Sequence, residues 1–364
     1  MKIGSNPTIA WYVSGHGFGH GRRTRQALSA LATLRPDVRL IVRSAATASL
    51  FEGIANTTVI PPFELFDPGV VELDTLTIDP AASIKRLSEI LNRRDKIIKA
   101  EAEFLRRVGV NLVVSDIPFL AADPAELVRV PAIAVGNFTW DWIFEPFVGN
   151  PTDAMIEQIR QSHEKFEAIL HLPLGHEVTR FRQVIEVPLL ATPAHFDRVT
   201  TLYKLGLNQA DPRPMILIAL RGGLAPEAMI AAAAQSRDLQ FLVNQPIENP
   251  PENLHSIAPA RGIDFSDILA ACDVAVSKLG YGILSDCIVN QTALLYPPRT
   301  GFREDEISRQ ICPLYMRMRE ISGQDFGAGN WRAELISLLQ QPPARGKLPT
   351  DGDHVIAELI SGHV

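Results

Sequence analysis

Short apolar runs alternate with longer amphipathic stretches along the first half of the chain. The runs have the length and continuity of buried strands, which we expect at 8–14, 38–43, 58–60, 112–115 and 132–135. The stretches between them place apolar residues three or four positions apart, as one face of a helix requires. We expect these helices at 22–34, 46–51, 84–108 and 122–129. Such alternation is typical of a parallel sheet whose faces are covered by helices.

A second series of the same kind begins after residue 200. Its expected strands are 214–220, 239–244, 254–256, 274–276 and 293–296, and its expected helices are 225–236, 265–271, 283–289, 304–321 and 353–361. The stretch 195–213 contains the expected boundary, where Asp-Pro-Arg-Pro at 211–214 has the composition of a linker. We therefore expect domains at 1–205 and 206–345, with the final helix in 346–364 packing back on the first. Ligands bind beyond the carboxyl ends of parallel strands, which places the strand-to-helix loops of both halves at a central cleft.

Composition narrows the class of protein. The chain has 364 residues, of which 46% are hydrophobic and 21% charged, enough for two sizeable cores. The net charge of −6 gives no sign of a nucleic-acid footprint, and the local basic group Arg22, Arg23 and Arg25 suits an anionic small molecule or a solvated helix face. Three cysteines, an odd and sparse set without a Cys-x-x-Cys pair, fit a reducing compartment. With no signal peptide and no apolar run of membrane-spanning length, we expect a cytoplasmic protein without a transmembrane segment.

Four glycines and two histidines alternate in the loop after the first expected strand, Gly-His-Gly-Phe-Gly-His-Gly at 15–21. Glycine lets a ligand approach the backbone closely, and histidine places a titratable base where ligands bind. The spacing matches neither the dinucleotide fingerprint nor the phosphate loop. Metal binding by His16 and His20 would need both on one helix face, and the glycines argue against a helix here. The alternative is a tight turn with one solvated and one packed histidine.

Two further loops of the first half are expected at the same edge. Asp116 ends the strand 112–115, where a carboxylate can hold an imidazole in one tautomer, or can simply cap the next helix. The segment 136–142 contains Asn137, Trp140 and Asp141. Its aromatic rings can stack on sugar rings or belong to the core.

In the second half, the strongest signal is Lys-Leu-Gly-Tyr-Gly at 278–282, between an expected strand and an expected helix. Backbone amides at a glycine-rich helix start bind anions, and Lys278 adds a charge suited to a diphosphate. Asp286, one turn further on, can reach ribose hydroxyls. The alternative for Lys278 is a solvated surface amine, and the alternative for Asp286 is a first-turn acid whose charge interacts favourably with the helix dipole. The acidic cluster within 297–306 can likewise contact sugar hydroxyls or start a helix.

Together these segments resemble the GT-B glycosyltransferases, of the peptidoglycan N-acetylglucosaminyltransferase type, with a closer likeness to the glycosyltransferase-like N-terminal region of plant arabinokinases. The carrying segments are Gly-His-Gly-Phe-Gly-His at 15–20, Val-Ser-Asp at 114–116, Asn-Phe-Thr-Trp-Asp at 137–141, Lys-Leu-Gly-Tyr-Gly at 278–282 and Phe-Arg-Glu-Asp-Glu at 302–306. They are spread over most of the chain in the family's order. Arabinokinase activity itself is not implied, because the chain stops before a sugar-kinase domain.

The resemblance implies an α/β fold of two Rossmann-like domains, acceptor-side first and nucleotide-sugar-binding second. It implies inverting transfer of a sugar from a nucleoside diphosphate sugar, with UDP favoured, to an unknown acceptor hydroxyl, without metal or other cofactor. His20 matches the catalytic base and Asp116 its supporting carboxylate. The other acceptor-side residues implied are His16, Gly17, Gly19, Asn137, Trp140 and Asp141. Those implied for the donor are Arg221, Gly222, Arg261, Gly262, Lys278, Gly280, Tyr281, Gly282, Asp286, Arg303 and Glu304.

The donor segment departs from the family's pattern. Ile283 and Leu284 stand where related enzymes often carry serine or threonine to bond the phosphates, and the ribose acid is Asp286 rather than a glutamate. Two alternatives therefore stay open: a module that binds a sugar nucleotide without transferring it, and an epimerase or hydrolase of sugar nucleotides on the same architecture.

Overall fold

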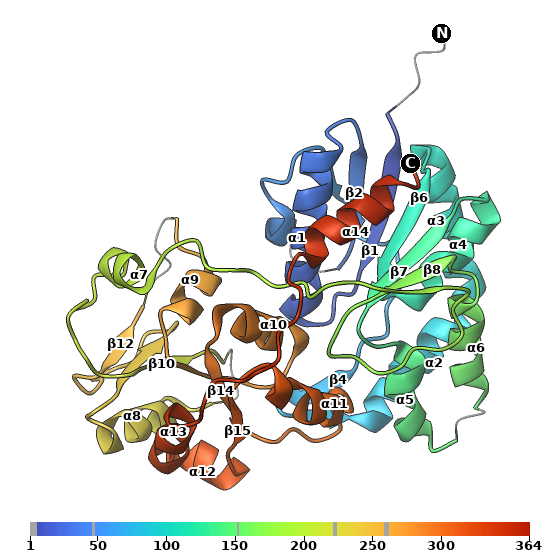
Figure 1. Cartoon of the computed structure of the whole chain (residues 1–364). Coiled ribbons are helices and arrows are strands. Elements are labelled where there is room, and N and C mark those ends of the chain that lie inside the picture. The colour runs from blue at the N-terminus through green and yellow to red at the C-terminus, as the bar shows by residue number, and fades with distance from the viewer. Residues whose placement is uncertain (1–5, 46–47, 151–152, 221–223, 258–261) are drawn as a thin grey trace. The chain divides into compact units, whose positions relative to one another are not determined.

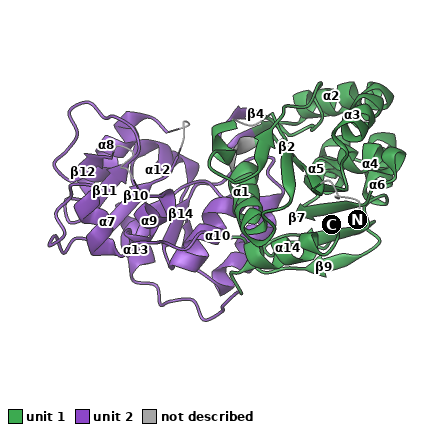
Figure 2. Ribbon diagram, turned by 90° about the horizontal axis from the view of Figure 1, so that it is seen from above, with its two compact units in different colours: residues 1–71, 78–190, 349–364 green, residues 72–77, 191–348 purple. Residues whose placement is uncertain are grey.

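The protein's structure, a computed structural model, describes residues 6–45, 48–150, 153–220, 224–257 and 262–364. The chain divides into two compact units (Figure 2). Unit 1 comprises residues 1–71, 78–190 and 349–364, and unit 2 comprises residues 72–77 and 191–348. Each unit contains its own parallel sheet, so the predicted α/β class with two parallel sheets is confirmed.

Unit 1 is built on a seven-stranded parallel sheet with the order β3-β2-β1-β6-β7-β8-β9. Every residue of its central strands is buried, which explains why they are continuous apolar runs rather than alternating ones. The strands are β1 (Thr8–Val13), β2 (Arg39–Arg43), β3 (Thr57–Val59), β6 (Leu112–Asp116), β7 (Ala132–Gly136), β8 (Ala168–His171) and β9 (Val184–Glu186). The helices of this unit are α1 (Gly17–Leu34), α2 (Pro80–Asn92), α3 (Arg94–Val108), α4 (Ala122–Val128), α5 (Trp140–Val148), α6 (Ala154–His163) and α14 (Gly352–Ser361), with 3₁₀ turns η1 (Ala48–Phe51) and η2 (Phe119–Ala121).

The first helix begins earlier than predicted. We expected a loop through Gly21 and a helix from residue 22, but α1 begins at Gly17 and includes both Gly19 and His20. A glycine in a helix costs only about 1 kcal/mol relative to alanine, so these glycines do not prevent the helix. Gly21 has a packing role instead, because a Cβ there would lie 2.7 Å from a methyl carbon of Leu50 in η1.

The single helix predicted over 84–108 is wrong: α2 and α3 meet at Arg93, whose φ of −107° and ψ of 6° interrupt the helix. Apolar spacing could not show this break, because both helices keep their apolar faces toward the core. Charged side chains at the break bond other segments of unit 1: Arg93 pairs with Glu64, and Arg94 pairs with Asp123.

The C-terminal helix α14 packs against α1 within unit 1 (Figure 1). Its buried face is formed by Ile356, Ala357 and Ile360. The contact also has a polar component, since the Arg35 guanidinium, just after α1, donates to the carbonyl oxygen of Val364 at 3.0 Å. The last 16 residues of the chain, 349–364, therefore belong to the same compact unit as its beginning.

Unit 2 is built on a six-stranded parallel sheet with the order β12-β11-β10-β13-β14-β15. Apolar side chains on one face of this sheet pack against α8, α12 and α13 in one cluster, in which Trp331 and Phe241 are fully buried. The strands are β10 (Met215–Ile218), β11 (Gln240–Val243), β12 (Leu254–Ser256), β13 (Val274–Val276), β14 (Ala293–Tyr296) and β15 (Met318–Glu320). The helices are α7 (Arg198–Lys204), α8 (Pro226–Gln235), α9 (Phe265–Ala270), α10 (Tyr281–Asn290), α11 (Glu304–Ile311), α12 (Gly323–Ala328) and α13 (Arg332–Leu339), with the 3₁₀ turn η3 (Cys312–Leu314).

One predicted helix in this unit needs correction. The helix expected over 304–321 ends at Ile311, and β15 follows it, because Pro313 has no amide hydrogen with which to continue a helix. The region 195–213, where we expected the domain boundary, contains α7, whose N-cap Asp197 accepts from the backbone amide of Thr200 at 2.8 Å.

A short segment from the first half of the chain also belongs to unit 2. Strands β4 (Val71–Asp74) and β5 (Thr77–Asp79) form a small two-stranded sheet. The amide of Thr300 donates to the carbonyl oxygen of Leu76 at 2.8 Å, and Leu76 packs against the unit 2 core.

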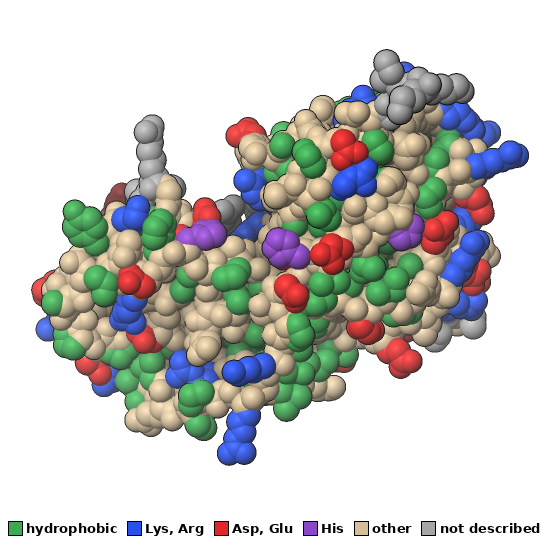
Figure 3. All heavy atoms as spheres, turned by 45° about the horizontal axis from the view of Figure 1, so that its top comes forward, with side chains coloured by type: hydrophobic (Ala, Val, Ile, Leu, Met, Phe, Trp, Pro, Cys, Tyr) green, Lys and Arg blue, Asp and Glu red, His purple; other side chains and the backbone are tan. Residues whose placement is uncertain are grey.

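On the face that Figure 3 shows, acidic and basic side chains are interspersed.

Candidate functional site

The carboxyl ends of β1, β6 and β7 bring three predicted residues together in unit 1. These strands are neighbours, and the strand order reverses between β1 and β6. His20 lies in the first turn of α1, Asp116 is the last residue of β6, and Asn137 follows β7. A reversal point of this kind is where open α/β sheets form ligand sites.

His20 and Asp116 form a buried pair. Nδ1 of His20 lies 2.9 Å from Oδ1 of Asp116, and the two residues are 8% and 1% exposed. The ring of Phe138 meets the His20 ring edge-on at a centroid distance of 5.7 Å. The interpretation of Asp116 as a helix cap is therefore wrong, since its carboxylate bonds side chains of α1 instead of amides of the next helix.

Two residues that the sequence did not single out for this role complete the network. Arg23 donates to both oxygens of Asp116, with Nε 2.8 Å from Oδ2, and its Nη1 donates to Oδ1 of Asn137 at 2.7 Å. Thr24 donates its hydroxyl to Oδ2 of Asp116 at 2.8 Å. The expectation that Arg23 serves an anion or a solvated surface is wrong, because its guanidinium is buried against these partners. The sequence signal that could have identified this role is the three-residue spacing of Arg23 from His20, which places both on one face of α1.

The charges of this network fix the state of the carboxyl group. Burial by itself would raise the pKa of Asp116, but the positive charges of Arg23 and His20 and their hydrogen bonds bring that pKa well below its usual range. An ionised carboxylate only accepts hydrogen bonds, so the Nδ1 proton of His20 points to it. Arg23 Nη2 lies 3.0 Å from the same Nδ1 because both groups donate to Oδ1. Nε2 of His20 is then the basic nitrogen.

A second carboxyl group, Asp67, lies close to this network and was missed by the sequence analysis. Its oxygens accept from the Ser14 hydroxyl at 2.5 Å and from the Trp140 indole at 2.8 Å. Burial raises the pKa of Asp67 to about 6, although the Ser14 hydrogen bond and the charge of His20 oppose that shift. Asp67 lies in a loop between predicted elements, where neither periodicity nor a motif marks it.

The remaining acceptor-side residues have different environments. His16 is the N-cap of α1 and borders a cavity, while Gly17 and Gly19 are in the first helical turn. Trp140 is buried and turned to Asp67. Asp141 faces α6, where its Oδ2 accepts from Arg160 at 3.2 Å.

We expected His16 and His20 not to share a metal ion because the glycines would prevent a helix. That premise was wrong, since α1 begins at Gly17, with His16 as its N-cap and His20 in its first turn. No group of three or more metal-binding side chains gathers anywhere in the described part of the chain.

In unit 2 the loop after β13 occupies the equivalent place, because the strand order reverses between β10 and β13. Gly280 is the N-cap of α10, and a Cβ at Gly280 or Gly282 would meet no atom within 4 Å. Burial lowers the pKa of the half-buried Lys278, and the nearby charge of Glu72, 3.9 Å from its Nζ, opposes that shift. This helix start therefore combines an adjacent ammonium group with open space.

The carboxylate of Asp286 bonds the protein backbone, whereas the motif suggested a contact with ribose hydroxyls. Asp286 is 2% exposed, and its Oδ1 accepts from the backbone amide of Thr192 at 3.0 Å. Four residues on, Asn290 donates to the Thr192 carbonyl oxygen at 3.0 Å. This face of α10 holds the segment that begins at residue 191.

The other donor-side residues are distributed around the same unit. Tyr281 opens α10, Arg303 is the N-cap of α11, and Glu304 is its first residue, so the acidic cluster does start a helix. Gly262 has a left-handed φ of +72°. Arg221, Gly222 and Arg261 lie outside the described residues.

Comparisons with known proteins agree with this architecture. No protein-family model matches the chain. The L-arabinokinase of Arabidopsis thaliana is 27% identical over 364 residues, which cover 97% of this chain and 34% of that protein. This is distant homology over the whole chain, and the chain spans about a third of the length of that relative.

Several solved structures share the fold over nearly their whole length. The calicheamicin glycosyltransferase CalG4 is 16% identical with a TM-score of 0.66, covering 98% of this chain and 95% of that one. UDP-glucose: anthocyanidin 3-O-glucosyltransferase in complex with UDP is 13% identical with a TM-score of 0.61, covering 98% and 94%. MnaA of S. aureus, solved with UDP, is 13% identical with a TM-score of 0.60, covering 98% and 95%. The chain therefore has the GT-B glycosyltransferase fold. None of the helices in the described ranges is long and apolar enough to cross a membrane.

Proposed function

We propose that this GT-B chain transfers a sugar from a nucleoside diphosphate sugar to an acceptor hydroxyl with inversion, using His20 as the base. The observation that supports this most is the contact of 2.9 Å between His20 Nδ1 and an Asp116 carboxylate that Arg23 keeps ionised. That contact leaves Nε2 of His20 as the nitrogen that can accept a proton.

The reaction follows from this arrangement in one displacement. Nε2 of His20 takes the proton of the acceptor hydroxyl while the hydroxyl oxygen forms a bond to the anomeric carbon. The bond from that carbon to the diphosphate breaks, and the nucleoside diphosphate leaves with the bonding electrons. Entry opposite to departure inverts the anomeric centre. Asp116 stabilises the imidazolium that forms, as a buried carboxylate beside a histidine base does in hydrolases.

The donor side of the proposal rests on the start of α10. Helix N-terminal amides and Lys278 would offset the charge that develops on the leaving diphosphate, so that no metal ion is required. UDP is the favoured nucleotide because two proteins of the same fold were solved with it. The three cysteines are buried and unpaired, which fits the cytoplasm as the place of action.

The direct test compares His20→Ala with a matched control. Purified protein would be incubated with UDP, GDP and dTDP sugars and an acceptor mixture, and products would be identified by NMR. His20→Ala should lose at least about 10²-fold in transfer rate. His171→Ala removes another buried histidine bonded to a carboxylate, Glu186 at 2.9 Å, and should keep its rate. Full turnover by His20→Ala would exclude this residue as the base.

A binding module without transfer activity is the second candidate, and one observation favours it. The first turn of α10 contains Ile283 and Leu284, and the carboxylate of Asp286 is bonded to Thr192. Calorimetry that finds tight UDP binding, with no consumption of any donor sugar, would support this candidate over the transferase.

A further inference from the structure

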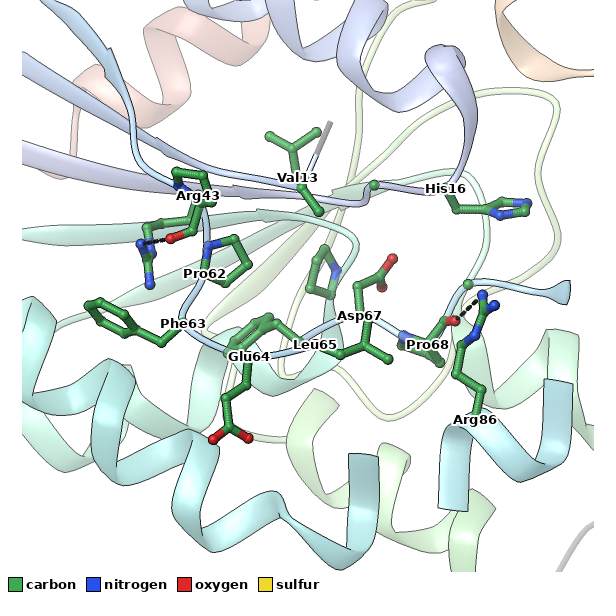
Figure 4. A pocket seen from close by; sticks show the side chains of 16 residues that line it. Val13, His16, Arg43, Pro62, Phe63, Glu64, Leu65, Asp67, Pro68 and Arg86 are labelled. Atoms are coloured by element: carbon green, nitrogen blue, oxygen red, sulfur yellow. Dashed lines mark hydrogen bonds between the residues drawn. The ribbon is translucent and has the colours of Figure 1, made fainter. Parts of the chain in front are cut away.

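A cavity of about 510 Å³ lies in unit 1 beside the ends of β1 and β2. Cavities of this size hold small molecules. One wall is the loop 61–69, which supplies prolines, Phe63 and Leu65, and the opposite side includes Val13 and His16 (Figure 4). The walls are therefore largely apolar, with a few charged side chains among them.

Most of those charged side chains are already neutralised. Arg43 is buried and paired with Glu101, and Glu64 is paired with Arg93 and Lys96, each at 2.6 Å. Asp67 differs, because among the described residues its hydrogen-bond partners are the neutral donors of Ser14 and Trp140.

The Asp67 carboxyl group has acceptor capacity to spare and a fixed position. A carboxylate offers about four lone-pair sites, and these two donors occupy two of them. The loop is held closely on its other side: Gly69 has a left-handed φ of +54°, and a Cβ there would lie 3.2 Å from Cβ of His16. Groups fixed in this way before a ligand arrives orient it with little loss of freedom.

Asp67 is also joined to the proposed base by a short chain of contacts. Ser14 donates its hydroxyl to Asp67 at 2.5 Å and its backbone amide to the carbonyl oxygen of Asp116 at 2.7 Å, and Asp116 bonds His20 at 2.9 Å. A molecule hydrogen-bonded to Asp67 would therefore lie near His20. On the far side of the loop, Arg86 donates to the Pro68 carbonyl oxygen at 3.4 Å and borders the same cavity (Figure 4).

We infer that this cavity takes the acceptor of the proposed reaction, and that Asp67 is a specificity residue accepting a hydrogen bond from a neutral, polyhydroxylated ring. The inference rests on the proposed function. A ring with several hydroxyls matches the cavity because Asp67 can accept from one hydroxyl and Arg86 can donate to another. Its C–H faces would pack against the prolines and Phe63, as sugar rings pack on apolar walls.

Binding is tested without any donor. Methyl α-D-glucopyranoside, methyl β-D-xylopyranoside and myo-inositol would be titrated into the full chain at up to 50 mM and followed by NMR. At least one should bind, and Asp67→Asn should weaken it about tenfold, the loss expected for one hydrogen bond to a charged group. Glu64→Gln is the control, since it borders the same cavity with its charge already paired. Binding by none of the three probes, or equal binding by wild type and Asp67→Asn, would overturn the inference.

Two further measurements cover the cases in which Asp67→Asn is unstable or in which no sugar binds. Trp140→Phe removes one donor to Asp67 while keeping an aromatic ring, and it should weaken the same probe about threefold. It replaces Asp67→Asn as the test if that variant does not fold. Binding of 4-nitrophenol that is unaffected by Asp67→Asn, with no binding of the sugars, would assign the cavity to flat apolar molecules and overturn the polyhydroxyl class. Probe binding needs neither a donor sugar nor proton transfer, so failure of the transferase proposal in the turnover assay leaves this binding result standing, and the two failures are distinguishable.

Discussion

Glycine-rich turns lead from β1 into α1 and from β13 into α10, and they differ in what the acidic residue beside them does. Each lies where the strand order of a parallel sheet reverses, and each leads into a helix that begins at glycine-rich sequence. In unit 1 the carboxylate of Asp116 bonds His20, Arg23 and Thr24. In unit 2 the carboxylate of Asp286 bonds the backbone of Thr192. Beside two similar turns, the carboxylate from β6 therefore joins a charged side-chain network, while the carboxylate from α10 holds a backbone segment.

The difference extends to how each turn would treat a ligand. Unit 1 places a positioned imidazole and a buried ion pair at its turn, which suits proton transfer. Unit 2 places open space around Gly280 and Gly282 beside the half-buried Lys278, which suits a group that approaches the backbone. In the proposed reaction, side chains would do the chemistry in unit 1, while backbone amides and one ammonium group would do the binding in unit 2.

The largest expected effect comes from Asp116→Asn. It leaves the buried Arg23 guanidinium without its carboxylate, which should lower the free energy of unfolding by about 3–5 kcal/mol. Transfer should fall about 10³-fold, because the imidazolium of His20 loses its stabilising charge. Chemical denaturation and donor turnover would measure the two effects. Glu101→Gln is the matched control: it breaks the buried pair with Arg43 in the same unit and should cost stability but not rate.

The effect of Asp116→Asn on the free energy of unfolding should also depend on pH. Because the folded-state pKa of Asp116 lies below its unfolded value, its contribution to stability is complete above about pH 4 and is lost as the pH falls through the folded pKa. The stability difference between wild type and Asp116→Asn should shrink on acidification below pH 4. A difference that stays constant from pH 7 to pH 2 would contradict the assignment of an ionised Asp116.

A smaller effect is expected from Asp286→Ala in unit 2. The variant leaves the half-buried Thr192 amide without this acceptor and should lower the free energy of unfolding by about 1–3 kcal/mol. UDP affinity, measured by calorimetry, should stay within about twofold of wild type. If UDP affinity instead falls tenfold while thermal stability is unchanged, Asp286 binds the nucleotide, and the two turns are more alike than their contacts indicate.

The smallest expected effect is that of Lys278→Met, which removes the charge while keeping most of the length of the side chain. UDP affinity should fall about tenfold, since a charge-assisted contact to phosphate is lost. Weaker salt dependence of binding should accompany the loss. Lys204→Met changes a lysine that packs over Phe196 in the same unit and serves as control. Equal losses in both variants would point to net charge instead of a diphosphate contact at Lys278.

The sequence predicted the elements whose signal is local. Continuous apolar runs predicted strands such as β1, β6 and β13, because buried parallel strands need apolar side chains on both faces. It did not predict β9, which is short and partly exposed, or the break at Arg93, where the apolar spacing continues from one helix into the next. Of the candidate site, the sequence indicated His20 and Asp116 as partners, and it missed Arg23 and Asp67 in their present roles.

The amino-acid pattern was enough to locate most of the buried strands, several helices and the glycine-rich turns along the chain, because these follow from side-chain size, polarity and backbone freedom at neighbouring positions. The partner of each charge came from the tertiary structure alone. Asp116 meets Arg23 across 93 positions of sequence, Asp67 meets Trp140 across 73, and Asp286 meets Thr192 across 94. Contacts at such separations depend on strand order and on helix packing, which bring together residues that no local pattern connects.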